Sequence, residues 1–359
     1  MATSAYAATP VVLEESQHTY SLALHFNFLE DTSGELTIEQ VSSPTWDEQF
    51  IVNTNESPNF GFTSSAYWLR FDVHNDSNHE RHMILHTGIP IMNRIDVYTS
   101  EEKSWEHWQT GDIFPFHQRP LEHSHFLFPI SLEGNQSKTV YIRLKSATPL
   151  RLSATLLDAL QAGVNSYRIS WFFGLFYGVI LAMSIYNLFL FFVVREALYL
   201  SYVAFNICIL LGTLATEGHG YQFLWPDYPW WNSVSLQLTN MSGLAALLLL
   251  TQQALDLKQQ MPKLFWFFNG LISIATVVAL SAFVLPTEFS IKLLVVTGPP
   301  SVLIILLTTG YCWFRGILSA NYIVLAWITF IISILLSIAS TWQILPSTFW
   351  ADNGRLLGP

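Results

Sequence analysis

The sequence predicts a two-part fold: a β-sandwich domain outside the membrane, of jelly-roll-like type and about 160 residues, followed by an all-α bundle of at least six transmembrane helices. Three observations lead to this prediction. Only 12% of the 359 residues are charged and 51% are hydrophobic, whereas about a quarter of a soluble chain is charged. The charges gather in the first half of the chain. Apolar runs long enough to cross a bilayer fill the second half.

The two halves differ in net charge. Up to Asn165 the chain has 9 Lys and Arg against 20 Asp and Glu, a net of −11, and the remainder has 7 against 6, a net of +1. An acidic domain argues against nucleic acid and anionic lipid as partners, because both require clustered Lys or Arg. A neutral or cationic ligand is easier to accommodate. Cys208 and Cys312 both lie in the second half, so core burial rather than a disulfide must hold the first domain together.

Residues 1–8 form an A-x-A-like array of small residues without the basic and apolar segments of a signal peptide. We interpret them as the remnant of an export signal, the alternative being an ordinary disordered N-terminus. The domain outside the membrane then covers residues 9–160.

Short strands separated by turn residues fill the segment 9–157. The clearest strand is 67–74, in which Tyr67, Leu69, Phe71 and Val73 alternate with Trp68, Arg70, Asp72 and His74. Further strands are expected at 83–86, 94–99, 125–130, 139–145 and 151–156. This spacing predicts an antiparallel sandwich of the jelly-roll or immunoglobulin-like kind.

The outward face of the main strand offers the first candidate site. Trp68, Arg70 and His74 would place an aromatic platform beside polar groups, as a sugar or carboxylate site requires. A Trp and an Arg on a sheet face also stack on each other, and this structural interpretation is preferred.

Histidines form the second candidate site. His117, His123 and His125 are close in sequence, and the last two share one face of an extended segment. The default interpretation is solvated histidines on a sheet. We predict no metal and no cofactor, because no third ligand, Cys pattern or HExxH motif accompanies them. No nucleophile elbow, phosphate-binding glycine loop or spaced acid pair is present, so no catalytic residue is predicted in this chain.

Six apolar runs predict membrane-spanning helices within a helical domain over residues 166–345. The expected spans are 169–194, 197–216, 234–255, 264–285, 289–314 and 320–345. The loops that we assign to the cytoplasm carry Arg195, Lys258, Lys263 and Arg315. The N-terminal domain is therefore predicted to lie outside. Residues 346–359 either precede a seventh helix that this chain lacks or end a protein with both termini outside.

Some residues of the membrane half have predicted roles of their own. Gly174 and Gly178 lie on a small-residue face of the first span that permits close helix packing. Asn187 is expected to cross-link helices by hydrogen bonds. The outer loop 217–231 offers His219, Trp225 and Asp227; its aromatic residues are typical of an interfacial belt and, second to that, of a contact surface for the outer domain.

These motifs together resemble the bacterial seven-transmembrane receptors with diverse intracellular signalling modules. In the outer domain the resemblance lies in Tyr67-Trp-Leu-Arg-Phe-Asp-Val-His-Asn75, Arg94-Ile-Asp-Val-Tyr98, Gly111-Asp112, Arg119 and Tyr141-Ile-Arg143. In the membrane half it lies in Gly174, Gly178, Tyr186-Asn-Leu-Phe-Leu-Phe191, Arg195, Tyr199-Leu-Ser-Tyr202, Gly220, Leu224-Trp-Pro-Asp227 and Pro229.

The resemblance implies a receptor of the bacterial inner membrane. Its jelly-roll domain, related to carbohydrate-binding modules, would sense a small-molecule or carbohydrate ligand, and Arg119 joins the ligand-binding candidates. Its helices would pass the change to a cytoplasmic histidine kinase, diguanylate cyclase or phosphatase, an output module that this chain lacks. The enzyme class of the full-length protein is therefore unassigned, and a homodimer stays open.

Two other functions are weighed against the receptor. A transporter or channel with an accessory outer domain is the alternative, although no span carries a carboxylate at its middle and no repeat relates the first three spans to the next three. A membrane-tethered carbohydrate-active enzyme is the third, and it would require two carboxylates about 5–10 Å apart in an outer cleft.

Overall fold

The computed structural model describes residues 8–328, apart from positions 57, 89, 103 and 326. By their internal contacts these residues divide into two compact units. Of the described residues, the first unit contains 8–180, 210–237 and 282–291, and the second contains 181–209, 238–281 and 292–328. Among the described residues, the two loops predicted to lie outside, 217–231 and 286–288, therefore group with the β-domain, and the basic loops predicted to be cytoplasmic group with the other unit.

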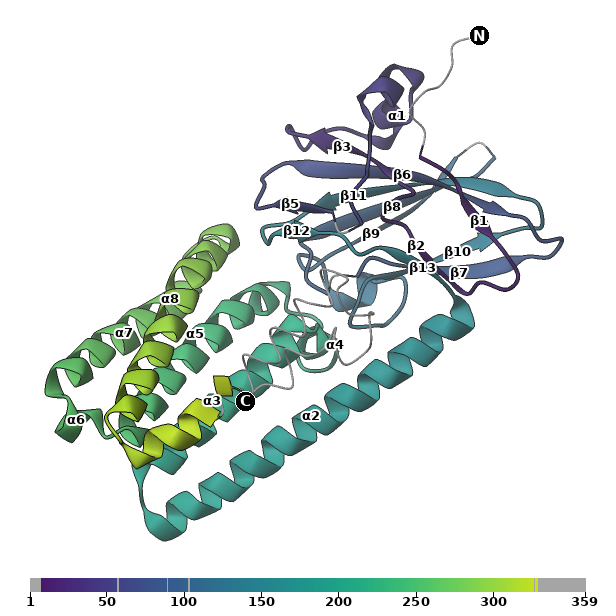
Figure 1. Cartoon of the computed structure of the whole chain (residues 1–359). Helices are drawn as coiled ribbons and strands as arrows, with labels where there is room; N and C mark the ends of the chain where they lie inside the picture. Colours follow the sequence, from purple (N-terminus) through teal and green to yellow (C-terminus); the bar gives the residue numbers. More distant parts are fainter. Residues whose placement is uncertain (1–7, 57, 89, 103, 326, 329–359) are drawn as a thin grey trace. The chain divides into compact units, whose positions relative to one another are not determined.

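The β-domain is a sandwich of two sheets (Figure 1). The larger sheet has the order β4-β3-β6-β11-β8-β9, and β1 pairs in parallel with β6. Its strands are β1 (Val11–Leu13), β3 (Asn27–Asp31), β4 (Ile51–Val52), β6 (Ala66–Asn75), β8 (Arg94–Ser100), β9 (Trp105–Thr110) and β11 (Ser137–Lys145). The smaller sheet, β10-β7-β13-β2, contains β2 (Thr19–Ser21), β7 (Arg81–His86), β10 (Leu127–Leu132) and β13 (Thr155–Asp158). A third, two-stranded sheet contains β5 (Asn59–Gly61) and β12 (Leu150–Arg151).

The main hydrophobic core includes one face of β6. This strand contributes Tyr67, Leu69, Phe71 and Val73, the four residues predicted to share a face. Strands of the smaller sheet contribute the opposing side chains, among them Leu85 of β7. Burying a side chain of this size stabilises a fold by about 1.5–3 kcal/mol. The alternation predicted for the main strand is confirmed, and so is the sandwich.

The opposite face of β6 is also covered. Between β3 and β4 the chain forms the short helix α1 (Ile38–Val41) and the 3-10 helix η1 (Pro44–Gln49). Ile38, Val41 and the neighbouring Phe50 form a second apolar cluster with Trp68 and Tyr141. The larger sheet is therefore buried on both faces at this position.

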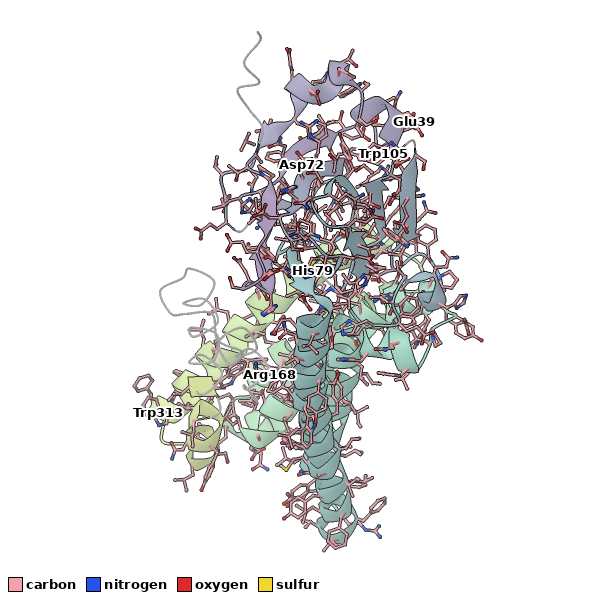
Figure 2. All side chains as sticks on the ribbon, turned by 90° about the vertical axis from the view of Figure 1, so that its right-hand side faces the viewer. Glu39, Asp72, His79, Trp105, Arg168 and Trp313 are labelled. Atoms are coloured by element: carbon pink, nitrogen blue, oxygen red, sulfur yellow. The ribbon has the colours of Figure 1, made fainter. Side chains whose placement is uncertain are left out.

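Five helices within the described residues are long and apolar enough to cross a membrane. They are α2 (Ala159–Val194), α3 (Ala197–Thr216), α5 (Pro229–Ala254), α7 (Pro262–Ser281) and α8 (Thr287–Phe314). The short helices α4 (His219–Phe223) and α6 (Leu257–Gln260) lie between them in sequence. Side chains on the long helices are mostly carbon, whereas oxygen and nitrogen atoms are spread over the β-domain (Figure 2). The predicted span 320–345 lies mostly, and the loop 346–359 entirely, outside the described residues.

Helix α2 follows the last strand of the sandwich without a linker. β13 ends at Asp158 and α2 begins at Ala159. Asp158 Oδ1 accepts a hydrogen bond from the Leu160 N–H at 3.0 Å and so caps the helix. The 36 residues of α2 extend over ~54 Å at 1.5 Å per residue, which exceeds the ~30 Å of a hydrocarbon core. The helix therefore begins well before the span predicted from residue 169.

The residues with a predicted helix-packing role, Gly174, Gly178 and Asn187, all lie on α2. Gly174 and Gly178 are exposed, and a Cβ atom added to either would meet nothing within 4 Å. Asn187 donates to the Met183 carbonyl of its own helix at 2.9 Å. Their helix-packing role stays a prediction.

Candidate functional site

The β-domain contacts the loop between α3 and α5, and we call this contact the joint. Its β-domain side is the loop 111–126, and its other side is the segment 215–232, which includes α4. The Phe116 N–H, at the start of the 3-10 helix η2 (Phe116–Gln118), donates to the Pro226 carbonyl at 2.9 Å. Both sides of the joint belong to the same compact unit.

An aromatic cluster lies at the centre of the joint. It contains Phe116, Ala215, Tyr221 and Trp225, and the rings of Phe116 and Tyr221 meet edge to face with centroids 5.8 Å apart. The Tyr221 hydroxyl donates to the Phe114 carbonyl. An aromatic pair of this kind contributes about 0.5–1.5 kcal/mol beyond its buried area. The aromatic outer loop thus forms a contact surface for the outer domain, the second of the two roles expected from the sequence.

Arg119 places a buried positive charge on the β-domain side of the joint. It is 5% exposed, and its Nη1 donates to the carbonyls of His123 and Ser124 at 2.9 and 2.7 Å. The guanidinium lies 4.1 Å from the centroid of the Phe126 ring, a cation–π contact. Asp112 Oδ1 is 3.7 Å from Nη2. Burial raises the pKa of Asp112 and lowers that of Arg119, so each residue needs the other to keep its charge.

Four histidines meet at the joint. His86 Nε2, at the end of β7, is 3.0 Å from His125 Nδ1, and His123 Nδ1 accepts from the His125 N–H at 2.9 Å. His219 Nδ1, in α4, is 3.0 Å from the Tyr177 hydroxyl of α2. Burial lowers the pKa of all four imidazoles. No three metal-ligating side chains among the described residues are arranged to hold a metal ion.

The joint brings together six residues that the sequence selected in separate segments: Arg119, His123, His125, His219, Trp225 and Asp227. Asp227 Oδ1 is 3.4 Å from His117 Nδ1 at the surface. Sequence reasoning missed four other residues of the joint, namely His86, Asp112, Tyr177 and Tyr221. His86 and Tyr177 lie in other segments and share no local spacing with the rest. Tyr221 lies in the outer loop 217–231, where its aromatic ring was attributed to an interfacial belt. Asp112 is the remaining one. It was noted only within the family resemblance, and its proximity to Arg119 was the available signal.

The remaining three candidates lie away from the joint. Trp68 is 0% exposed under α1. Arg70 pairs with Asp47 of η1, and its guanidinium is 4.5 Å from the Phe50 ring. His74 is half-buried. The open aromatic platform, the less favoured of the two interpretations from the sequence, does not form among the described residues, because α1, η1 and Phe50 cover Trp68 and part of Arg70.

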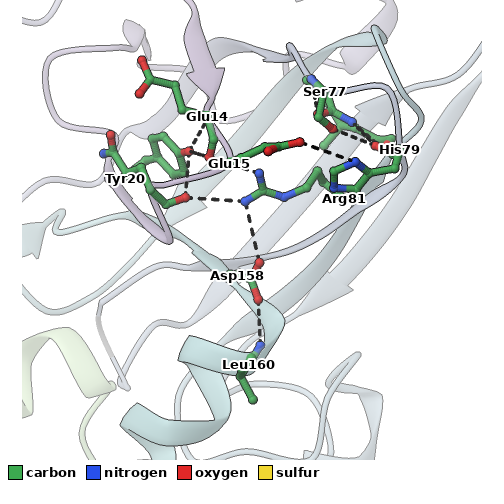
Figure 3. Close-up of polar contacts among 11 residues, drawn as sticks. Glu14, Glu15, Tyr20, Ser77, His79, Arg81, Asp158 and Leu160 are labelled. Carbon is green, nitrogen blue, oxygen red and sulfur yellow. Dashed lines mark hydrogen bonds and ion pairs between the residues drawn. The ribbon is translucent and has the colours of Figure 1, made fainter.

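A cleft of about 520 Å³ opens beside the end of β13. It is lined by Glu15, His18, His79, Glu80, Arg81, His82, Asp158 and Ala159. Arg81 is 7% exposed. Its Nη1 donates to the Glu14 carbonyl at 3.1 Å, and its Nη2 is 3.7 Å from Asp158 Oδ2 (Figure 3). The same Asp158 caps α2, so the wall of the cleft is connected to the first turn of that helix.

We expect Gly218→Ala to open the joint. Gly218 has a φ of +76°, which disfavours a side chain, and an added Cβ atom would lie 2.5 Å from the Ser124 carbonyl oxygen. The chain can relieve this clash by separating α4 from the β-domain. We measure deuterium exchange in the full chain in lipid nanodiscs. If the variant lowers the free energy of opening the joint by ~1.4 kcal/mol or more, the Phe116 amide should exchange at least about tenfold faster.

The matched control for this variant is Gly163→Ala. Gly163 lies in α2, where an added Cβ atom would meet nothing within 4 Å, and alanine favours a helix over glycine. Phe116 should keep its wild-type exchange rate in this control. Wild-type protection of Phe116 in Gly218→Ala would show that the close approach at this glycine does not hold the joint.

Two family models match the chain. The model described as 7TMR-DISM extracellular 2 matches residues 23–158, and the model described as 7TM diverse intracellular signalling matches residues 169–358, which is more than half of the chain. No curated protein gives a match. The first match ends at the residue that caps α2, so the family models divide the chain where the structure passes from strand to helix.

Proposed function

The chain belongs to the seven-transmembrane receptors with diverse intracellular signalling modules, and from this premise we propose that it binds a small ligand outside and passes a conformational change through its helices. Members of this family are transmembrane receptors with an extracellular sensor domain, and these domains are not themselves catalytic. The chain is accordingly a multi-pass membrane protein with an extracellular N-terminal sensor domain.

The direct passage from β13 into α2 is the observation that supports transmission most strongly. A helix that begins at Ala159 and continues to Val194 has no flexible linker in which a displacement of the sandwich could be lost. Asp158 belongs to the strand, to the cleft and to the helix cap at once. A ligand that moves this carboxylate therefore acts on the first turn of α2.

The cleft beside Arg81 is the ligand site that we propose. Its carboxylates, Glu15, Glu80 and Asp158, outnumber its one arginine, whose guanidinium is already engaged by backbone carbonyls and Asp158. This charge balance favours a neutral or cationic polar ligand over an anion. The cleft is large enough for a monosaccharide or a small amine. No aromatic side chain lines it, so a sugar would be held by hydrogen bonds rather than by stacking.

The receptor would act in the bacterial inner membrane, with its sensor domain in the periplasm. The α2–α3 hairpin at Arg195 lies in the predicted cytoplasmic loop, where a downstream histidine kinase, diguanylate cyclase or phosphatase would receive the change. A ligand can shift the receptor between two states only by its difference in affinity for them. Ligand binding by the sensor domain and the conformation of the α2–α3 hairpin must therefore be measured separately.

We expect Asp158→Ala to uncouple ligand binding from the helices. Loss of the cap costs about 0.5–2 kcal/mol of helix stability, so the first turn of α2 should fray while the sandwich stays folded. The full chain in nanodiscs is first screened by thermal shift against sugars, small amines and carboxylates. With a ligand that binds, labelling of a cysteine introduced at Glu196 should change in the wild type and stay constant in Asp158→Ala.

The control is Asp76→Ala, which removes an exposed carboxylate remote from the cap. It should respond to the ligand as the wild type does. A ligand that binds tightly yet leaves the Glu196 position unchanged in the wild type would overturn the receptor proposal. Flux of that ligand into proteoliposomes would support the transporter alternative instead.

A further inference from the structure

The histidine cluster at the joint crosses from the β-domain to the outer loop. His86, His123 and His125 belong to the β-domain, whereas His219 belongs to α4. The rings of His86 and His125 are stacked, with centroids 5.2 Å apart and planes 14° apart. The ring of His219 lies 5.0 Å from that of Phe173 in α2. All four imidazoles are buried or half-buried within one compact unit.

The hydrogen bonds in the cluster cannot all survive when every ring is protonated, because the accepting nitrogens must be free of hydrogen. His86 Nε2 and His125 Nδ1, 3.0 Å apart, share one hydrogen, so one nitrogen donates and the other accepts. If both rings were protonated, two N–H groups would face each other. His123 Nδ1 accepts a backbone N–H and must also be unprotonated. A proton on His123 Nδ1, or protons on both His86 and His125, therefore break a hydrogen bond in addition to placing charge in a buried site.

The charged and titratable groups around the cluster are few: Asp112 and Arg119 from the loop 111–126, Tyr177 from α2, and Glu217 and Tyr221 from the outer loop. Arg119 already supplies a positive charge close to His123 and His125. Asp112 is occupied by Arg119 and by the Met92 N–H, to which Oδ2 is bonded at 2.8 Å. Additional positive charge is thus poorly compensated.

We propose that the histidine cluster is a proton-binding site, and that protons taken up from the outside release the outer loop from the β-domain. The ligand of this site is the proton itself rather than a metal ion, since the described side chains offer no three-ligand arrangement. The inference rests on the proposed function in one respect, namely that opening of the joint affects the signal passed to the helices. Proton uptake does not depend on a ligand in the cleft.

The direction of the pH effect follows from the burial of the rings. Burial, followed by the charges of neighbouring histidines, lowers the pKa of His86 and His219 to about 4 and that of His125 to about 3. An open joint returns water to these rings and moves them toward the ordinary value of about 6.5. The open state then binds more protons between about pH 4 and pH 6.5, so the closed joint loses stability as the pH falls through this window.

Asp112 acts in the opposite sense. Burial raises its pKa, so in the buried state it takes up a proton more readily than in water, and this favours the closed joint in acid. Asp112 is a single group, whereas four imidazoles bind protons more readily when the joint is open. The net effect of acid is therefore to open the joint.

The test follows deuterium exchange at Phe116, whose N–H is bonded across the joint. The full chain in nanodiscs with EDTA is measured from pH 7.5 to pH 5, and each rate is divided by the intrinsic exchange rate at that pH. We expect protection of Phe116 to fall at least about tenfold by pH 5. A single histidine whose pKa is about 4 in the closed joint and returns to 6.5 on opening already lowers the closed-to-open ratio by roughly thirtyfold at this pH. Amides in the centre of β6 should stay protected.

Two variants assign the effect to the cluster. His125→Gln with His219→Gln keeps hydrogen-bonding side chains that do not titrate, and it should make the fall in protection smaller, because only His86 and His123 of the cluster still titrate. His25→Gln, which removes a histidine of the β-domain outside the joint, should keep the wild-type profile. Constant protection of Phe116 from pH 7.5 to pH 5, or an equal fall in the double variant, would overturn the proposal. So would loss of protection with Zn²⁺ at pH 7.5 in the absence of EDTA.

The result is separable from the proposed function. Acid that opens the joint without changing labelling at Glu196 would count against the signalling role and leave the proton site established. If a ligand of the cleft changes labelling at Glu196 while protection of Phe116 does not depend on pH, the receptor function is supported and the proton site is refuted.

Discussion

Arg119→Ala should destabilise the β-domain by about 3–5 kcal/mol, because it leaves the buried Asp112 carboxylate without its partner. It also removes the donors to the His123 and Ser124 carbonyls, which hold the loop 111–126 in shape. Pulse proteolysis in urea on the full chain in nanodiscs measures the free energy of unfolding of the β-domain. Arg119→Lys should lower the free energy of unfolding by less than Arg119→Ala does, because lysine keeps the positive charge. It lacks the planar guanidinium that reaches two carbonyls and stacks on Phe126.

His117→Ala is the matched control at the same joint. His117 and Asp227 form an ion pair whose side chains are 64% and 67% exposed, and pairs in water contribute little. The free energy of unfolding should change by less than about 1 kcal/mol. If Arg119→Ala were no more destabilising than this control, the burial and pairing of the arginine would not be what stabilises the loop.

Trp68→Ala should cost about 3–5 kcal/mol in the same measurement, because it empties the space between β6 and α1. The indole Nε1 is buried without a hydrogen-bond partner. Trp68→Phe therefore removes ring volume but no hydrogen bond, and we expect it to cost only about 1–2 kcal/mol.

Ligand affinity separates the structural role of Trp68 from a binding role. With the ligand found in the thermal-shift screen, Trp68→Phe should bind as the wild type does, because the ring is covered and remote from the cleft. A folded Trp68→Phe protein that binds the ligand at least about tenfold more weakly would support a binding role for Trp68, the less favoured interpretation from the sequence.

The sequence predicted the elements whose signal is local. β6 was expected at 67–74 and extends over Ala66–Asn75, because its alternation of apolar residues is itself the property that buries one face. The apolar runs likewise predicted α2, α3, α5, α7 and α8, since length and hydropathy alone suffice for a span. The earlier start of α2 was not predicted, because a helix continues past the membrane surface wherever a cap such as Asp158 permits it.

The elements that were missed depend on distant partners. β9 was not predicted, because this edge strand carries Glu106 and His107 and shows little alternation. The expected strand 151–156 divides into β12 and β13, which pair with different strands. The joint was predicted residue by residue but not as a site, because its two sides are about 100 positions apart and no spacing rule relates them.

The parallel pairing of β1 with β6 has a consequence for biogenesis. Val11 is in register with Val73, so β1, which is synthesised before β6, can pair only after ~60 further residues have followed it. Until then its unpaired amides and its apolar Val and Leu side chains are open to other chains. Insertion of β1 should therefore be a late step of folding, and substitutions in Val11–Leu13 should lower the yield of exported protein more than they lower the stability of the finished molecule.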